Sequence, residues 1–155
     1  MFNKDYAEEF LVTYLKLGYS LTGAKKSLQF LYDALKDVNG AIDYENTDIP
    51  RDPKDPGYKY GAIIDRIVTR EKEIIKLMDT YTEVGILIED SLIRMDLPEK
   101  YALIPVLFRE KYILRQDDKT LMKKYKIPKT TYWRWMQIGF EHFDIPNVDW
   151  ADILN

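Results

Sequence analysis

Basic side chains recur between residues 119 and 135 without an intervening acid, and the chemistry open to such a row is the neutralisation of phosphates. The cations are Lys119, Lys123, Lys124, Lys126, Lys129 and Arg134. A solvent-exposed helix face usually mixes positive and negative charges, whereas this stretch holds one sign alone. Lysine and arginine contact the phosphates of nucleic acids. The spacing therefore favours nucleic-acid binding over an ordinary solvated face.

Residues suited to enzyme chemistry are sparse. His142 is the only histidine and cysteine is absent, so thiolate chemistry and disulfides are excluded. A lone histidine near the end of a helix is more often structural, and Asp96 and Glu99 fit the start of a helix. No glycine-rich phosphate loop, nucleophile motif or metal-ligand spacing occurs. We expect a protein that is not an enzyme and that needs no cofactor and no metal.

Two short helices joined by a tight turn are expected to position the cations. Asp117 and Asp118 suit the capping of the first helix, and Pro128 suits the first position of the second, residues 128–143. The turn is Tyr125-Lys126-Ile127. Helix, three-residue turn and helix is the spacing of a helix-turn-helix. The residues offered to a shared core are Leu121, Met122, Tyr125, Tyr132, Met136, Phe140 and Phe143.

The outward face of helix 128–143 is expected to read DNA, because a helix fits the major groove and its early residues reach base edges. We assign Arg134 to a guanine edge, Gln137 to an adenine edge or a phosphate, and Thr130 to a phosphate or a thymine methyl. Trp133 either packs on a thymine methyl or sugar edge, or is a buried core side chain. The expected phosphate contacts are Lys119, Lys123, Lys124, Lys126, Lys129 and Thr131.

The residues before position 96 predict two long helices. Apolar residues recur at steps of four and three from Phe10 to Val38, which is a heptad seam within a helix over 5–38. Gly18 and Gly23 allow for a kink or a break in this helix, and Asn39-Gly40 is expected to stop it. Residues 39–59 hold three prolines and predict a polar loop. A second helix follows over 60–95, with Met78 on its seam.

The predicted fold is therefore all-α: an antiparallel helical hairpin over 1–95, a three-helix helix-turn-helix domain over 96–143 and an acidic tail over 144–155. Pro105 requires the first helix of that domain to bend or to begin near Ile104. The tail carries the apolar residues Trp150, Ile153 and Leu154. These either pack back on the domain or form a segment whose acids mask the basic face.

Charge and hydropathy set further bounds on the 155-residue chain. Its net charge is −3, but residues 96–143 hold 10 basic and 6 acidic side chains, whereas residues 1–95 hold 13 and 17. The asymmetry matters more than the total. The N-terminus lacks a signal pattern and no apolar run is long enough to span a membrane. We expect a cytoplasmic protein that does not contact a membrane.

Residues 97–143 resemble region 4 of bacterial sigma factors, and the arrangement of the whole chain resembles the ArpU/RinA-type late-transcription regulators of phages. The matching features are Leu97-Pro98-Glu99, Arg109-Glu110-Lys111-Tyr112, Ile127, Thr131, and Met136 one turn after Tyr132. The sequence departs from the pattern at Lys126, where glycine is usual, at Met122, where a small residue is usual, and at Trp133 and Trp135. The resemblance implies a sequence-specific transcriptional regulator encoded by a phage or prophage and acting in the host bacterial cytoplasm.

Double-stranded DNA is the expected partner. One half-site gives modest affinity, so RNA polymerase or a second copy bound through the hairpin is expected as co-partner. Ile63, Ile75, Ile86 and Ile93 lie partly off the seam and imply a contact with the C-terminal domain or with another copy. Two other functions stay open: a protein-interaction or scaffold module with a degenerate helix-turn-helix, and a DNA-binding phage packaging protein.

Overall fold

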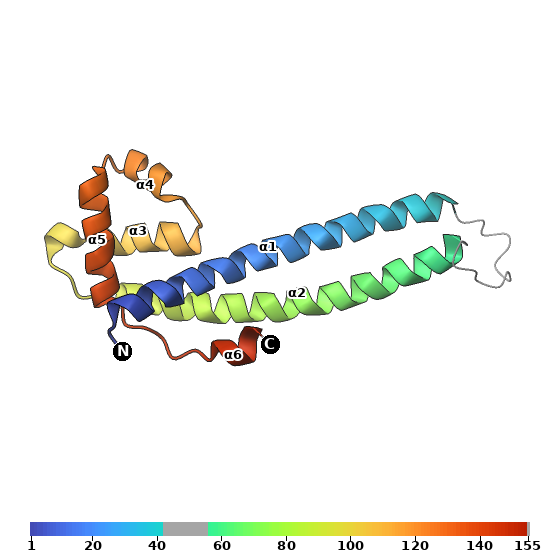
Figure 1. Cartoon of the computed structure of the whole chain (residues 1–155), viewed down its shortest axis with the longest axis horizontal. Helices are drawn as coiled ribbons and strands as arrows, with labels where there is room; N and C mark the ends of the chain where they lie inside the picture. The colour runs from blue at the N-terminus through green and yellow to red at the C-terminus, as the bar shows by residue number, and fades with distance from the viewer. Residues whose placement is uncertain (42–55, 155) are drawn as a thin grey trace. The chain divides into compact units, whose positions relative to one another are not determined.

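The chain is helical in the residues that the structure, a computed structural model, describes: 1–41 and 56–154 (Figure 1). The expected all-α class is confirmed, with a pair of long helices first in the chain. The described residues form no β-strand beyond one isolated antiparallel bridge between Phe2 and Asp144. The elements are α1 (Lys4–Ala41), α2 (Pro56–Ile93), η1 (Glu99–Tyr101), α3 (Ile104–Phe108), η2 (Arg109–Ile113), α4 (Asp118–Lys124), α5 (Lys129–His142) and α6 (Trp150–Leu154).

The two long helices extend further into the expected loop than the sequence predicts. α1 continues through Gly18 and Gly23 without a break, and it passes Asn39-Gly40, so the expected stop there is wrong. Helical hydrogen bonding along α1 outweighs the low helix propensity of single glycines. α2 begins at Pro56, whose missing N–H suits the first helical position. The middle of the expected 39–59 loop, residues 42–55, lies outside the described residues.

Packing divides the chain into two units, and the division crosses both long helices. The core unit comprises Met1–Gly18 and Thr80–Asn155, and the hairpin unit comprises Tyr19–Asp79. The sequence instead suggests domain borders at residues 95/96 and 143/144. The helix-turn-helix domain over 96–143 stays a prediction.

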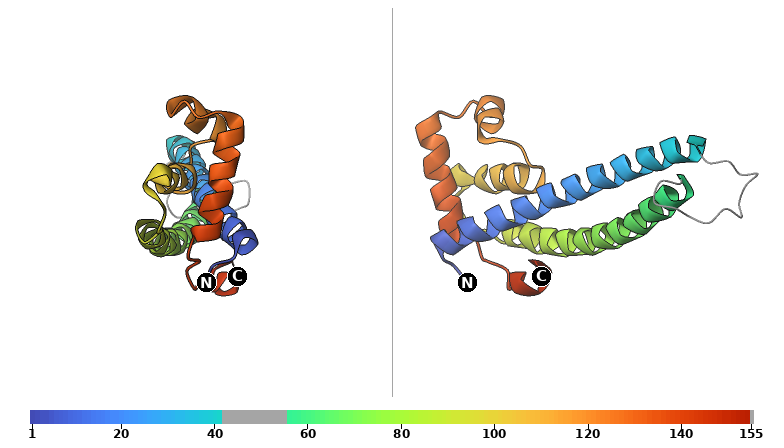
Figure 2. Two further views of the ribbon diagram at one scale, coloured as in Figure 1. Left: turned by 90° about the vertical axis from the view of Figure 1, so that its left-hand side faces the viewer. Right: turned by 45° about the vertical axis from the view of Figure 1, so that its right-hand side comes forward.

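In the hairpin unit, the second half of α1 and the first half of α2 lie side by side and run in opposite directions (Figure 2). Leu21, Ile67 and Ile74 are buried between them. The placement of Met78 on the seam is wrong, because 43% of this residue is exposed. After Ile74 the seam steps by three and then by four, so the half-buried Leu77 takes the position expected for Met78.

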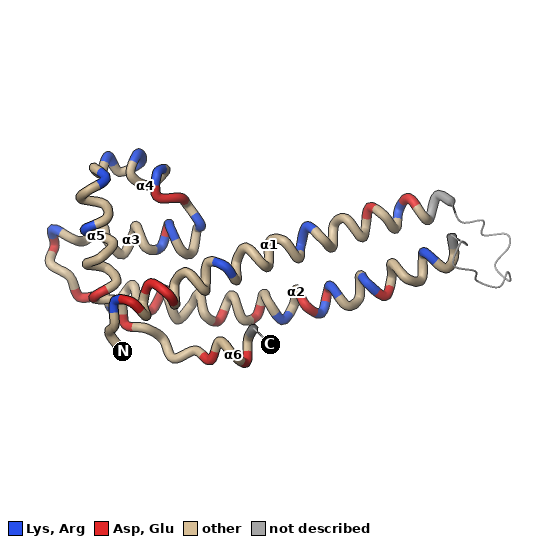
Figure 3. Tube along the Cα trace, in the orientation of Figure 1, with Lys and Arg blue, Asp and Glu red and all other residues tan. Residues whose placement is uncertain are grey.

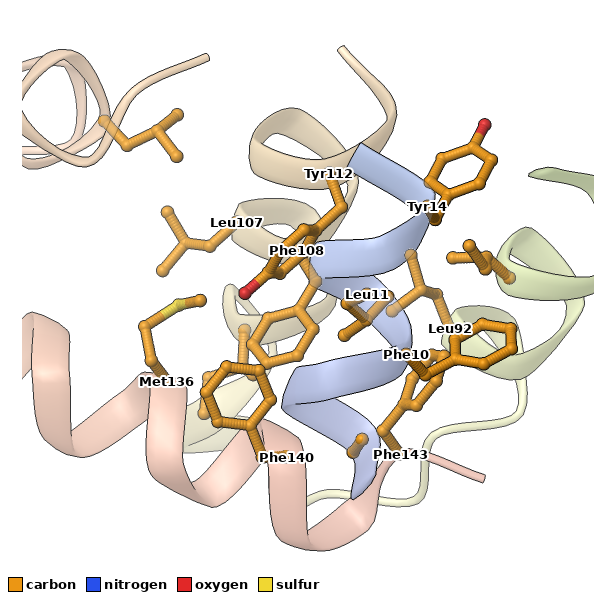
Figure 4. Packing of buried hydrophobic residues seen from close by; sticks show 14 of the residues in the cluster. Phe10, Leu11, Tyr14, Leu92, Leu107, Phe108, Tyr112, Met136, Phe140 and Phe143 are labelled. Atoms are coloured by element: carbon orange, nitrogen blue, oxygen red, sulfur yellow. The ribbon is translucent and has the colours of Figure 1, made fainter. Parts of the chain in front are cut away.

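The core unit surrounds a single apolar cluster to which α1, α2, α3 and α5 all contribute (Figure 4). Its fully buried aromatic side chains include Tyr14, Phe108, Tyr112, Tyr132 and Phe143. Pro105 lies in the first turn of α3, where it costs no hydrogen bond, so the second of the two expected solutions holds. The inward residues expected for the last long helix, Tyr132, Met136, Phe140 and Phe143, are all buried.

Two glycines let α1 and α2 approach closely inside the core unit. Tyr14 and Tyr81 stack with ring centroids 4.6 Å apart and an interplanar angle of 2°. A Cβ added at Gly18 would lie 2.9 Å from the Tyr81 ring, and one added at Gly85 would lie 2.7 Å from the Tyr14 hydroxyl. Each glycine therefore leaves room for the tyrosine of the opposite helix.

A third glycine brings α5 against α3. A Cβ added at Gly139 would lie 2.3 Å from ring atoms of Phe108 and 2.9 Å from Ile104. Distances this short are incompatible with any side chain at position 139 unless the buried Phe108 ring is displaced or the two helices move apart. Phe108 also meets Phe140 edge-on, with centroids 5.2 Å apart. The orientation of α5 is thus fixed by contact with α3.

The C-terminal tail packs back on the core unit, the first of its two expected arrangements. Trp150 and Ile153 are partly buried against the apolar cluster, and the Trp150 ring lies 5.3 Å from that of Phe10. The side chain of Asp144 forms an ion pair with the N-terminal amine, with Oδ1 and N 2.5 Å apart. The backbone carbonyl of Asp144 accepts a hydrogen bond from the Ser91 hydroxyl at 2.7 Å. The start of α1 and the end of α5 are therefore tied to α2.

Several apolar side chains of α2 stay uncovered within its own unit. Ile75 of the hairpin unit is 60% exposed, and Ile86 and Ile93 of the core unit are 56% and 73% exposed. The C-terminal helices of the core unit therefore do not cover Ile86 and Ile93. Among the described residues, no helix is both long enough and apolar enough to cross a membrane.

Candidate nucleic-acid interface

The first helix of the basic segment begins at a polar cap, as the sequence predicts. Asp117 is extended, and its Oδ1 accepts a hydrogen bond from the backbone N–H of Thr120 at 2.6 Å. This bond satisfies one of the four N–H groups that a helix start leaves without a partner. Asp118, the first residue of α4, accepts a hydrogen bond from the Tyr132 hydroxyl of α5. The start of α4 is therefore capped and linked to α5.

The turn between α4 and α5 is a Schellman motif. The N–H of Ile127 bonds to the carbonyl of Met122 at 2.9 Å, and the N–H of Lys126 bonds to the carbonyl of Lys123 at 3.4 Å. Lys126 has φ 54°, the left-handed conformation that glycine usually supplies. A left-handed backbone at a residue other than glycine costs roughly 1 kcal/mol. Ile127 is buried beneath the turn and anchors it.

Pro128 lies one position earlier in the helix than expected. It is the N-cap of α5, with φ −61° and ψ 147°, and not the first helical residue. Its carbonyl accepts a hydrogen bond from the N–H of Tyr132 at 2.9 Å. Proline fits this position because its fixed φ matches the extended cap geometry and no N–H is needed there.

The two faces of α5 differ as the sequence predicts. Tyr132, Met136, Gly139 and Phe140 are buried. Of the residues proposed to contact DNA, Thr130 and Arg134 are exposed, Trp133 is 40% exposed, and Thr131 and Gln137 are half-buried. The start of α5 thus presents polar and aromatic groups to solvent, which is what a recognition helix requires.

Basic side chains gather along α4 and the start of α5 (Figure 3). Lys119, Lys123, Lys126, Lys129 and Arg134 are exposed. Within the described parts of the chain, none of these five lies within ion-pairing distance of a carboxylate. Lys124 differs, because its Nζ lies 2.5 Å from Oε1 of Glu110. Five cations are therefore available to an external anion, and Lys124 is already engaged.

Trp133 lies on the surface beside Lys111. The Nζ of Lys111 lies 5.5 Å from the centroid of the Trp133 ring, and Tyr132 meets that ring edge-on at 5.3 Å. With 40% of the residue exposed, the alternative of a buried core tryptophan is wrong. Trp135 is partly buried against the apolar cluster.

Several charged or polar groups at this site have shifted pKa values, among them Asp117, Glu110 and Tyr132. The hydroxyl and the N–H of Thr120 hold the pKa of Asp117 below its usual value. The Lys124 ammonium, and then the Tyr125 hydroxyl, lower the pKa of Glu110. Burial, and then the hydrogen bond to Asp118, raise the pKa of Tyr132. The acids are therefore held ionised and the tyrosine protonated at neutral pH.

Glu110, Lys111 and Gly139 have positions here that the sequence does not predict. Glu110 and Lys111 of η2 pair with Lys124 and Asp118 of α4, so the pairing depends on how two separate elements pack and not on a spacing within one helix. Gly139 reads as an ordinary interior helix position until Phe108 is placed beside it. Arg115, with φ 57°, donates a hydrogen bond to the carbonyl of Gly18 at 2.9 Å and joins the turn before α4 to α1.

Metal coordination has no candidate here, since the structure groups no three histidine, cysteine or acidic side chains in the ranges it describes. No protein-family model, curated protein or solved structure matches the chain. The resemblance to sigma region 4 and to phage late regulators therefore rests on the matching residues of this sequence alone.

Proposed function

We propose that the chain is a sequence-specific regulator of transcription that binds double-stranded DNA, with α5 in the major groove. The observation that carries the proposal is the row of exposed cations on α4, the turn and α5 that have no carboxylate partner among the described residues, next to an outward helix face of mixed polar and aromatic groups. Unpaired lysines in such a row attract phosphates, which position a protein without specifying sequence.

The proposed contacts divide into contacts with base edges and contacts with phosphates. Arg134 can form two hydrogen bonds with the O6 and N7 of guanine, and Gln137 can do the same with adenine. Thr130 and Trp133 suit contact with a thymine methyl group. Lys119, Lys123, Lys126 and Lys129 would contact phosphates, together with Thr131. RNA polymerase or a second copy of the chain would supply the affinity that a single half-site lacks.

The first test is a fluorescence-anisotropy titration of labelled duplex DNA at several salt concentrations. Four phosphate contacts predict a slope of log affinity against log salt of about −3 to −4. A selection from a random duplex library then gives the preferred sequence. Absence of binding to any duplex at low salt would contradict the proposal.

Two variants separate base reading from phosphate contact. Arg134→Ala should weaken specific binding by about 1–3 kcal/mol and relax the base preference at one position. Lys123→Ala should weaken binding to all sequences alike and make the slope shallower by about 0.9. Lys72→Ala, at an exposed lysine of α2, is the matched control and should change neither quantity. Equal effects from all three variants would mean that the interface is misassigned.

A protein-interaction module is the second candidate, and the exposed isoleucines of α2 favour it. An interaction module would leave duplex DNA unbound at both low and moderate salt. A phage packaging role would keep DNA binding but shift the selected sequence from promoters to a packaging site. The binding titration and the selected site therefore distinguish all three.

A further inference from the structure

Two consecutive residues of η2 hold the two ends of α4. Glu110 pairs with Lys124, the last residue of α4, at 2.5 Å. Lys111 pairs with Asp118, the first residue of α4, at 2.9 Å. η2 is a π-helical turn, a form often found at functional sites. The turn presents neighbouring side chains of opposite charge to the opposite ends of one short helix.

The signs of these pairs suit the helix they hold. An acid at the start of a helix and a base at its end both oppose the helix dipole. α4 has seven residues, too few to be a stable helix without tertiary contacts. The Asp118 end is also hydrogen-bonded by Tyr132 of α5. The position of α4 is thus set by polar contacts at both ends as well as by the burial of Leu121.

Burial makes the two partners of the Glu110–Lys124 pair unequal. The Lys124 side chain is 56% exposed, whereas the Glu110 side chain is 12% exposed. The Oε2 atom of Glu110 is buried and has no hydrogen-bond partner within the described residues. If Lys124 moved to a DNA phosphate, Glu110 would keep a poorly solvated charge with no counter-ion, which is strongly unfavourable. Lys119, Lys123, Lys126 and Lys129 would leave no such charge behind.

We infer that Lys124 is a positioning residue and not a phosphate ligand: Glu110 and Lys111 form a two-ended clamp that sets α4, and through the Schellman turn α5, for binding. The inference rests on the proposed DNA-binding function and removes Lys124 from the phosphate contacts expected from the sequence. It also explains how α4, a helix of only seven residues, can hold its lysines in a fixed position.

The test combines glutamine substitutions, which keep side-chain length and remove charge. Lys124→Gln should lower the midpoint of thermal unfolding and weaken DNA binding about tenfold, because Glu110 is left without a counter-ion, with the salt slope unchanged. Glu110→Gln should unfold close to the wild-type midpoint, because the amide oxygen can still accept a hydrogen bond from Lys124. In the double variant E110Q/K124Q the two amides can hydrogen-bond in place of the ion pair, so the midpoint should rise back toward the wild-type value and the affinity should return to within about threefold of wild type.

Lys123→Gln is the matched control on the same helix. It should make the salt slope shallower by about 0.9, and adding Glu110→Gln should not restore it. A shallower slope for K124Q, without rescue by E110Q, would overturn the inference and return Lys124 to the phosphate contacts. Unchanged stability in K124Q would also overturn it. If the wild-type chain binds no DNA, the proposed function fails, while the rescue of unfolding still decides whether the clamp exists.

Discussion

The core unit and the hairpin unit are built from the same two long helices, but they bury their side chains very differently. In the core unit, α1 and α2 meet a cluster whose aromatic side chains are almost fully buried, such as Tyr14 and Phe108. In the hairpin unit, burial is limited to a narrow seam, while Phe30 is 72% exposed and Ile75 60% exposed. Segments with few buried apolar contacts open at lower free energy. Continuity of a helix therefore does not make its stability uniform.

The largest expected contrast comes from removing one phenylalanine from each unit. Phe108→Ala should lower the free energy of unfolding by about 3–5 kcal/mol, because it leaves a cavity between α3 and α5. Phe30→Ala should change it by no more than about 0.5 kcal/mol. Urea unfolding followed by far-ultraviolet circular dichroism measures both. Similar losses from the two variants would abolish the contrast between the units.

Glycines supply the second contrast, this time with opposite signs. Gly139→Ala should destabilise by about 1–3 kcal/mol, because its Cβ would overlap the Phe108 ring. Gly23→Ala should stabilise by up to about 1 kcal/mol, because nothing lies within 4 Å of the added Cβ and alanine is the better helix former. Thermal unfolding of the two variants checks the signs. A stable Gly139→Ala variant would mean that α3 and α5 can separate without cost.

Backbone strain is the third difference. Among the described residues, the two non-glycine residues with positive φ, Arg115 and Lys126, both lie in the core unit. Lys126→Gly should stabilise by about 1 kcal/mol by relieving the left-handed conformation. Lys126→Ala should bring no such gain, and both variants should make the salt slope of DNA binding shallower by about 0.9. A gain in stability from Lys126→Ala would place the cost in the side chain instead of the backbone.

Acid sensitivity should give the smallest effect, because the groups concerned lie at the surface. The N-terminal amine holds the pKa of Asp144 low, and Thr120 does the same for Asp117. A lowered folded-state pKa stabilises above the unfolded value of about 3.9, and this stabilisation is lost as the pH falls through the folded value. The midpoint temperature of thermal unfolding should therefore fall as the pH is lowered below about 4. Asp117→Asn, which keeps the capping oxygen, should flatten that dependence; an unchanged profile would show that Asp117 does not contribute.

Much of this fold could be predicted because its signals are local. The heptad steps from Phe10 onward, the acidic cap at Asp117 and the inward spacing of Tyr132, Met136 and Phe140 each depend on residues within a few turns of one another. The outward position of Arg134 and of four lysines follows from the same spacing. Their contact with DNA stays a prediction.

The features that the sequence did not reveal are long-range or depend on phase. The seam of α2 passes through Leu77 and Val84 and not through Met78, and an apolar residue stands at both 77 and 78, so the spacing alone does not choose between them. Helix continuation past Asn39-Gly40 overrode a local stop signal. The Glu110–Lys124 pair required the fold itself, because it joins a π-helical turn to the end of another helix.

The missing Cβ at position 139 has a mechanical consequence for any complex with a duplex. With the Phe108 ring filling the space where that atom would be, α5 cannot slide along its axis or roll to improve its fit without displacing α3. The DNA would then have to change its shape to fit α5, and the bending and groove width of DNA depend on base sequence. A rigid reader of this kind would favour sites that deform easily, including base pairs that no side chain touches.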